Sequence, residues 1–409
     1  MREILDKVKK ELRPDEKIIS EVDDTVKRIN SLLKKSGIKA ECMKGGSIAK
    51  GTFLKDDYDV DLFVRFDYSM KNKRLSDILE KVLKKEFNIK RVHGSRDYFQ
   101  FQNKLLFEIV PVLKINNYRK AENVTDMSPL HVDYVKKKLK RGQADDIRLA
   151  KQFCKAAKVY GAESYIKGFS GHILDLLIIH YGSFEKLLKN AIDWKPKVVI
   201  DIEKQLKNPL KELDRAKTHS PLVIVDPMQL CRNAAAALNR QKFEDFKEAC
   251  KKFLQQPSKE FFKVKGFSKK DVESTLKKNQ ELFFIEANPL KGKKDVIGAK
   301  LLKAYEFIKM SIKKNDFKIT ESEWEFKEKG IFYFIVKKEI LSEKVVVRGP
   351  PLNKKEGVKR FKAKHKKTFV KGDRVFAEEK RKYREAKKLV QDLLKKRYVL
   401  ERIKKIEII

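Results

Sequence analysis

The pattern of apolar positions changes its period several times along the chain. The first 36 residues follow a helical period, with a break at Pro14 and a stop at Gly37, and they predict two helices. From Ile38 short apolar runs bounded by turns replace that period. They predict a helix near 73–86 and strands near 38–43, 58–66, 89–92, 97–102 and 104–113. We therefore expect a mixed α/β region to about residue 125.

The middle of the chain is mainly helical in its pattern. Apolar residues from 128 to about 191 recur at helical spacing, and Tyr160-Gly161 predicts a glycine stop for one helix. The segment 173–179 is apolar on nearly all sides but too short to cross a membrane, which predicts a buried central helix. A strand at 222–225 and a helix at about 231–254 are expected to follow.

Strand patterns return after Pro257. Candidates lie at 281–287, 317–327, 331–337 and 343–348, with an amphipathic helix at about 295–314. Beyond Gly349-Pro350-Pro351 the chain is strongly basic, and a final helix is expected near 377–396. The sequence thus predicts an α/β (α+β) protein with three domains, at 1–125, 126–257 and 258–409.

The charge indicates a polyanionic partner. The formal net charge is +39, and 38% of the residues are charged, against about 25% in an average soluble protein. Such an excess of cations favours binding to phosphate backbones. A membrane surface is also anionic, but we find no long apolar span, signal peptide or lipidation motif. The cysteines lie far apart without a CxxC pair, so we expect reduced thiols and a cytoplasmic protein rather than a cysteine zinc site.

Two carboxylates lie on one face of an expected strand. Asp59 and Asp61 are two positions apart, while Val60, Leu62 and Val64 alternate with them toward the core. Neighbouring ionised carboxylates repel each other unless a cation lies between them. Oxygen-only ligands of this kind suit Mg²⁺.

A glycine turn precedes these carboxylates. Gly45-Gly46-Ser47, at the end of a strand and the start of a short helix, can offer backbone N–H groups and a hydroxyl to phosphate oxygens. It is not a P-loop, because the Gly-Lys-Ser/Thr ending is missing.

A third carboxylate would complete a two-metal site for nucleotidyl transfer. Glu108 lies in an otherwise apolar strand, where an unpaired charge is costly, and a place beside Asp59 and Asp61 would remove that cost. Asp57 shares the face of Asp59 and remains an alternative third ligand. Taken singly, a Gly-Gly-Ser segment is commonly a plain turn, an Asp-x-Asp pair a solvated strand face, and a lone Glu in an apolar strand an edge residue. Their ordered combination within about 65 residues is far more specific.

This combination resembles the DNA polymerase beta-like nucleotidyltransferase superfamily. Further segments narrow the resemblance to the archaeal (class I) CCA-adding enzymes, which build or repair the 3′-terminal CCA of tRNA. The segments are Gly46–Thr52, Tyr58–Phe63, Ser128–His131, Arg148–Lys151, Val159–Glu163, Gly168–Gly171, Val225–Pro227, Arg232–Ala236, Pro257–Phe262 and Arg348–Pro350. They keep the family's order and approximate spacing over most of the chain.

The resemblance implies a nucleotidyltransferase head, a helical nucleotide-binding central domain and a basic α+β C-terminal domain that binds tRNA. It implies that Asp59, Asp61 and Glu108 hold Mg²⁺ and that Arg232 helps to read the nucleobase. It also implies contacts to the incoming CTP or ATP from Ser47, Lys50, Ser128, His131, Lys151 and Tyr160. The family commonly has Arg, Thr and Asp at the positions of Lys50, Ser128 and Glu108. A homodimer is implied as well.

The residues alone support these assignments unequally. His131 is also read as a surface residue at a helix start, Tyr160 as a core or cap contact, and Arg232 as a solvated charge that starts a helix. Lys151 and Tyr160 are expected on one helix, where a shared ligand requires a bend. Basic and aromatic residues interleave in the last 60 positions, which suits the tRNA acceptor stem and 3′ end.

Two alternative functions remain open from the sequence. One is another nucleotidyltransferase, such as a poly(A) polymerase or an antibiotic-modifying enzyme, although the high charge argues against a small acceptor. The other is a catalytically silent RNA-binding protein that keeps the fold.

Overall fold

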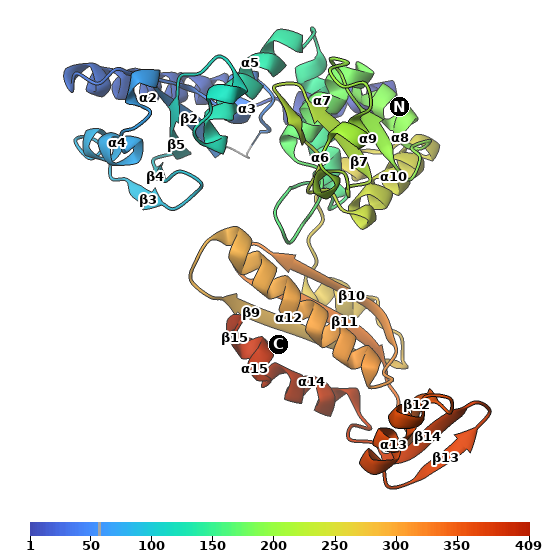
Figure 1. Ribbon diagram of the computed structural model, residues 1–409. Coiled ribbons are helices and arrows are strands. Elements are labelled where there is room, and N and C mark those ends of the chain that lie inside the picture. The colour runs from blue at the N-terminus through green and yellow to red at the C-terminus, as the bar shows by residue number, and fades with distance from the viewer. Residues whose placement is uncertain (56–58) are drawn as a thin grey trace. The chain divides into compact units, whose positions relative to one another are not determined.

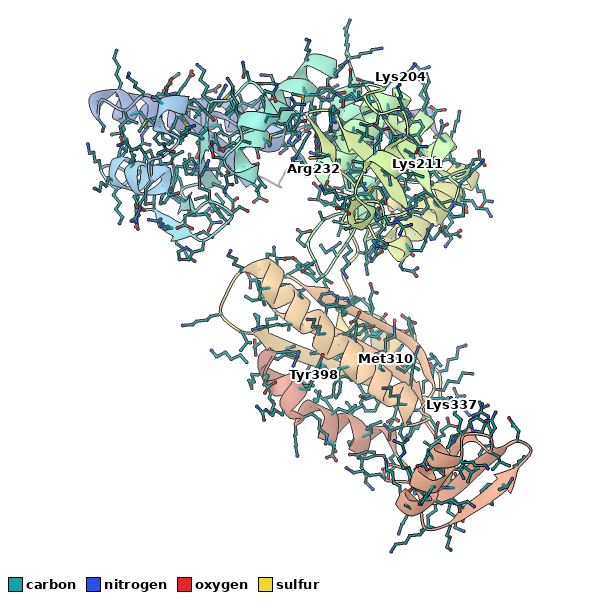
Figure 2. All side chains as sticks on the ribbon, viewed as in Figure 1. Lys204, Lys211, Arg232, Met310, Lys337 and Tyr398 are labelled. Atoms are coloured by element: carbon teal, nitrogen blue, oxygen red, sulfur yellow. The ribbon has the colours of Figure 1, made fainter. Side chains whose placement is uncertain are left out.

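The computed structural model describes residues 1–55 and 59–409, which form two compact units, Met1–Lys265 and Gly266–Ile409 (Figure 1). Helices and β-sheets occur in both units, which confirms the predicted α/β (α+β) class. None of the described helices is long and apolar enough to cross a membrane. Long side chains with nitrogen tips cover the surface of each unit, in keeping with the net charge of +39 (Figure 2).

The head of the first unit is built on a five-stranded sheet of order β1-β2-β5-β4-β3. β2 runs parallel to β5, and the other neighbours are antiparallel. Val60, Leu62 and Val64 are fully buried, because alternate residues of β2 face the core under the helices. The elements are α2 (Glu16–Lys35), β1 (Ala40–Lys44), α3 (Gly46–Lys50), β2 (Asp59–Phe66), α4 (Leu75–Leu83), β3 (Lys90–Val92), β4 (Tyr98–Gln102) and β5 (Leu106–Leu113).

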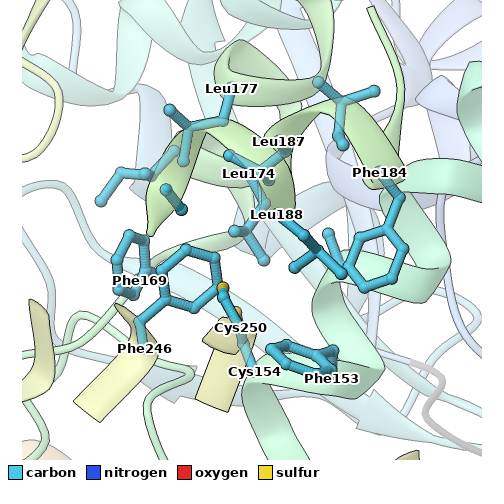
Figure 3. Packing of buried hydrophobic residues seen from close by; sticks show 14 of the residues in the cluster. Phe153, Cys154, Phe169, Leu174, Leu177, Phe184, Leu187, Leu188, Phe246 and Cys250 are labelled. Carbon is cyan, nitrogen blue, oxygen red and sulfur yellow. The ribbon is translucent and has the colours of Figure 1, made fainter. Parts of the chain in front are cut away.

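The rest of the first unit is mainly helical around an aromatic core (Figure 3). Phe153, Phe169, Phe184 and Phe246 are fully buried there. The expected apolar helix is α7, and its residues from Ile173 to Ile178 are buried, as predicted. The elements are α1 (Arg2–Leu12), α5 (Ser128–Lys138), α6 (Gln143–Ala156), α7 (Gly171–Tyr181), α8 (Phe184–Ala191), β6 (Val198–Ile200), α9 (Pro209–Glu212), β7 (Leu222–Asp226), β8 (Gln229–Asn233) and α10 (Arg240–Gln255).

Two helix boundaries differ from the expectation. The helix expected at 231–254 begins only at Arg240, because residues 229–233 form β8 against β7 and Asn239 caps the helix through a hydrogen bond from the Lys242 N–H (2.8 Å). The helix expected to end at Tyr160 ends at Ala156. Local patterns missed both boundaries, because the residues after α6 and before α10 pair with backbone outside the predicted helix: Tyr160 with Phe169, and β8 with β7.

The second unit holds two sheets. α12 and α14 pack on a four-stranded sheet of order β10-β11-β9-β15, and α13 packs against a smaller sheet of order β12-β14-β13 (Figure 1). The final helix expected at 377–396 begins at Ala386, because residues 374–380 form β14 between two strands. The elements are α11 (Lys269–Ser274), β9 (Gln280–Pro289), α12 (Lys294–Lys314), β10 (Ile319–Phe326), β11 (Gly330–Lys337), β12 (Lys344–Pro351), α13 (Lys355–Lys364), β13 (Thr368–Lys371), β14 (Arg374–Lys380), α14 (Ala386–Leu394), α15 (Arg397–Leu400) and β15 (Ile403–Ile408).

Candidate active site

Three carboxylates gather on the face of the head sheet opposite its core. The register of the parallel strands β2 and β5 puts Asp61 directly beside Glu108, and Asp59 lies two positions along β2 on the same face. The Glu108 carboxylate accepts a hydrogen bond from the Gln100 amide of β4 at 2.6 Å, which orients it. Asp57, the alternative third ligand, lies outside the described residues.

The electrostatics of this cluster favour a cation. Burial, together with the charges of Glu108 and Asp59, raises the pKa of Asp61 to about 6, and the ammonium groups of Lys50 and Lys151 only partly oppose this. The carboxylates therefore repel one another in the absence of a bound ion. A cation with oxygen ligands fits the donor set, since every ligand atom offered is a carboxylate oxygen.

The glycine turn lies in direct contact with Asp61. Gly46 has φ +48°, and a Cβ built there would lie 1.8 Å from Asp61 Oδ2. The Gly45 N–H donates to the Asp61 carbonyl oxygen at 2.7 Å, and a Cβ on Gly45 would lie 2.7 Å from the Phe63 ring. Only glycine fits at both positions, so the start of α3, with Ser47 in its first turn, approaches the carboxylates closely.

Two lysines link α3 and the turn after it to the helical part of the unit. Lys50 Nζ forms an ion pair with Asp175 Oδ2 of α7, and the Asp175 side chain is fully buried. Lys151 of α6 is buried too, and its ammonium donates to the Thr52 carbonyl oxygen (2.9 Å) and hydroxyl (3.2 Å). Both cations are close enough to Asp61 to act on its pKa.

Tyr160 lies near Lys151, although the two residues are not on one helix as expected. It does not share the helix of Lys151, because α6 ends at Ala156 and Tyr160 forms an isolated bridge with Phe169. A Cβ built on Gly171 would lie 3.2 Å from Tyr160 Oη and 3.5 Å from Lys151 Cε. The two side chains therefore converge on Gly171 although no helix face joins them.

His131 and Arg232 meet at a buried aspartate. His131 Nε2 lies 3.0 Å from both carboxylate oxygens of Asp226, and Arg232 donates to Asp226 Oδ2 at 3.1 Å. Burial alone would raise the pKa of the Asp226 carboxyl, but the adjacent His131 and His172 rings hold that pKa well below its ordinary value. Ser128 begins α5, one turn before His131. Arg232, which is labelled in Figure 2, lies on β8 rather than at a helix start.

Comparisons with known proteins agree along the chain. The nucleotidyltransferase domain family matches residues 24–153, the second domain of tRNA nucleotidyltransferase matches 145–263, and the C-terminal domain of CCA-adding enzyme matches 284–402. The CCA-adding enzyme of Nanoarchaeum equitans is 37% identical over 84% of this chain and 84% of its own length. The chain belongs to the CCA-adding enzyme family. A second member, the CCA-adding enzyme of Methanocaldococcus jannaschii, is 31% identical over 96% of this chain and 90% of its own length.

Membership of the CCA-adding family confirms that the chain is a nucleotidyltransferase. It also favours CCA addition to tRNA over poly(A) synthesis and over a catalytically silent RNA-binding role.

Solved structures share the nucleotidyltransferase fold with this CCA-adding family member. A cytoplasmic RNA terminal U-transferase has a TM-score of 0.51 at 15% identity and covers 65% of this chain and 98% of its own. The Cid1 poly(U) polymerase, solved with Mg and 3′-dATP, has a TM-score of 0.52 at 16% identity and covers 64% and 98%. At such low identity the likeness shows the fold alone.

Sequence reasoning missed three residues that organise this site in the CCA-adding chain. Asp175 interrupts an apolar helix, where an unpaired charge is as costly as it is in the strand around Glu108. Asp226 ends an apolar strand and appeared only as part of a resembling segment. His172 follows another such segment, and nothing in its local pattern distinguishes it, because its neighbours come from α5 and β7.

Proposed function

We propose that this chain adds CMP and then AMP from CTP and ATP to the 3′ end of tRNA, with Asp59, Asp61 and Glu108 as ligands of Mg²⁺. The observation that carries the proposal is the pairing of Asp61 with Glu108 across β2 and β5 next to a glycine turn. Bound there, Mg²⁺ would stabilise the charge on the triphosphate and favour deprotonation of the attacking 3′-hydroxyl. The repulsion that raises the pKa of Asp61 supports a cation at this place.

The incoming nucleotide is proposed to lie between the head and the helices of the first unit. The N–H groups at the start of α3 and the Ser47 hydroxyl would bind phosphate oxygens. Lys50 and Lys151 supply positive charge near Asp61, and Tyr160 converges with Lys151 at Gly171. The remaining proposed nucleotide contacts are Ser128, His131 and Arg232, of which the last two are held by Asp226.

The second unit is proposed to bind tRNA by shape and phosphate contacts. α13 is rich in lysine, and none of its residues is buried. The adjacent strand β13 exposes Phe369 and Val370, which gives a basic surface with apolar side chains for ribose and base contacts.

We also propose, from the family resemblance, that the protein is a homodimer and is located in the cytoplasm.

An incorporation assay tests this function. Purified protein is incubated with Mg²⁺, tRNA that lacks its CCA, and CTP or ATP or both. We expect CMP addition with CTP, completion by one AMP when ATP is present, and no further growth. A tRNA that already ends in CCA serves as the control and should stay unchanged. Open-ended AMP addition would contradict the proposal.

The Mg²⁺ requirement should depend on pH through Asp61. The pKa of about 6 means that Asp61 is largely protonated at pH 5 and ionised above pH 7, and the cation must displace that proton at low pH. We expect the Mg²⁺ concentration for half-maximal incorporation to be constant above pH 7 and to rise by up to about tenfold per pH unit below 6. Circular dichroism at each pH checks that the fold persists. An unchanged half-saturating concentration from pH 5 to 7 would disprove this role of Asp61.

A further inference from the structure

A second cluster of possible metal ligands shares no residue with the three carboxylates. His131 comes from α5, His172 from α7, and Asp226 from the end of β7, so three separate elements of the first unit meet there. The two imidazole rings lie 4.7 Å apart between centroids, and the Asp226 side chain is fully buried. The histidine side chains are only 14% and 18% exposed.

The spacing of the ligand atoms suits a small cation. His131 Nε2 lies 3.0 Å from the Asp226 oxygens, His172 Nε2 lies 3.8 Å from Asp226 Oδ2, and all three ligand atoms lie within 4.8 Å of one another. In a tetrahedral Zn²⁺ site, with bonds of about 2.0–2.1 Å, neighbouring ligand atoms are about 3.3 Å apart. The two distances to Asp226, 3.0 and 3.8 Å, bracket that value.

His172 supplies an independent observation. Its Nε2 atom is buried and has no hydrogen-bond partner among the described residues. A buried ring nitrogen without a partner costs free energy, and native proteins rarely keep one without a reason. The hydrogen bond between His131 and Asp226 leaves this nitrogen unsatisfied, whereas a cation held between the three side chains would use it.

The ligand types distinguish this cluster from the proposed Mg²⁺ site. Imidazole nitrogens suit Zn²⁺ and similar transition metals, whereas Mg²⁺ prefers oxygen ligands alone. We propose that His131, His172 and Asp226 form a binding site for a divalent transition metal of the Zn²⁺ class. Three protein ligands leave a further coordination position open for water or a phosphate oxygen.

Arg232 is the group that a metal ion must accommodate. Its guanidinium lies 3.1 Å from Asp226 Oδ2, but its side chain is 44% exposed and can move into solvent. Metal binding also uses the Nε2 lone pair of His131. A contact from His131 to the nucleotide, as proposed above, would then use Nδ1, and this consequence alone rests on the proposed function.

Cobalt titration tests the site, because Co²⁺ replaces Zn²⁺ at such sites and absorbs visible light strongly in four- or five-coordinate geometry. The full-length protein is freed of metal and titrated with CoCl₂ in millimolar Mg²⁺, without tRNA or nucleotide. We expect one equivalent of Co²⁺ to produce these bands and one equivalent of Zn²⁺ to abolish them. The variant His172→Asn should bind Co²⁺ at least about 100-fold more weakly, since it removes a direct ligand.

Matched variants separate this site from others. His93→Asn removes an exposed imidazole that also lies 3.0 Å from a carboxylate, that of Asp97, and should leave Co²⁺ binding unchanged. Cys231→Ser, which removes the exposed thiol, should do the same. If circular dichroism shows that His172→Asn is unfolded, His131→Asn replaces it. Absence of the bands in the wild type, or equal Co²⁺ affinity in the folded ligand variant, would overturn the proposal whatever the incorporation assay shows.

Discussion

Replacing Asp61 with Asn is expected to lower incorporation of CMP and AMP by about three orders of magnitude, while tRNA affinity changes little. The amide cannot carry the negative charge that binds the cation, and a metal contributes several kcal/mol to transition-state stabilisation. Asp61 lies at the centre of the cluster, beside Glu108 and in contact with the glycine turn, so no neighbouring carboxylate replaces it. Single-turnover incorporation and tRNA binding by filter retention measure the two effects.

The same variant should be more stable than the wild type at neutral pH without metal. A carboxyl whose pKa is raised to about 6 in the folded state favours folding while it is protonated and loses that contribution as the pH rises through 6. At pH 7 the ionised Asp61 side chain therefore lowers the free energy of unfolding by about 3 kcal/mol, and the uncharged amide removes this loss. We expect a higher melting temperature in EDTA at pH 7 and no difference below about pH 4.

A control for Asp61→Asn is Glu41→Gln, on the exposed part of the neighbouring strand β1. It removes one negative charge from the same sheet and should retain normal incorporation and stability. Wild-type turnover in Asp61→Asn would refute the proposed mechanism. A variant that is inactive and also less stable would point to misfolding instead.

Replacing Asp175 with Asn is expected to lower the free energy of unfolding by about 3–5 kcal/mol. The Asp175 side chain is fully buried and that of Lys50 is only 11% exposed, so the ammonium would remain buried without its counter-charge. The change should also weaken catalysis, because Lys50 belongs to α3, which begins at the glycine turn beside Asp61. Urea unfolding and incorporation rates measure the two effects.

An exposed ion pair provides the comparison for Asp175. Lys189 and Glu185 lie 2.7 Å apart on α8, with side chains 60% and 39% exposed, and Glu185→Gln should cost less than about 1 kcal/mol. The double variant Lys50→Met/Asp175→Asn should recover part of the stability, since it removes the buried charge. An Asp175→Asn variant as stable as Glu185→Gln would show that the buried pair contributes nothing.

Local patterns were sufficient wherever a residue's environment repeats along its own element. The alternation of Asp59 and Asp61 with three apolar residues predicted β2 and its two faces, and the fully buried core side confirms them. The apolar run at 173–179 predicted a buried helix, which is α7. The charge in the strand around Glu108 predicted a partner strand, and the register of β5 beside β2 places it next to Asp61.

Local patterns failed where pairing partners are distant in sequence. The first residues of the helix expected at 231–254 belong instead to β8, and those of the helix expected at 377–396 belong to β14. Each of these strands forms against neighbouring strands that lie outside the segment itself. Tyr160 was expected on the helix of Lys151. Instead it forms a bridge with Phe169, and its hydroxyl and the Lys151 side chain both approach Gly171.

The sequence by itself determined the fold class, the faces of β2, the glycine turn and, through its resembling segments, the CCA-adding family, because these depend on residue type and short spacing. Only the tertiary structure decided that Lys50 pairs with Asp175 and that His131, His172 and Arg232 surround Asp226. These contacts join residues up to 125 positions apart. Their geometry follows from how the helices and sheets pack, which no local pattern encodes.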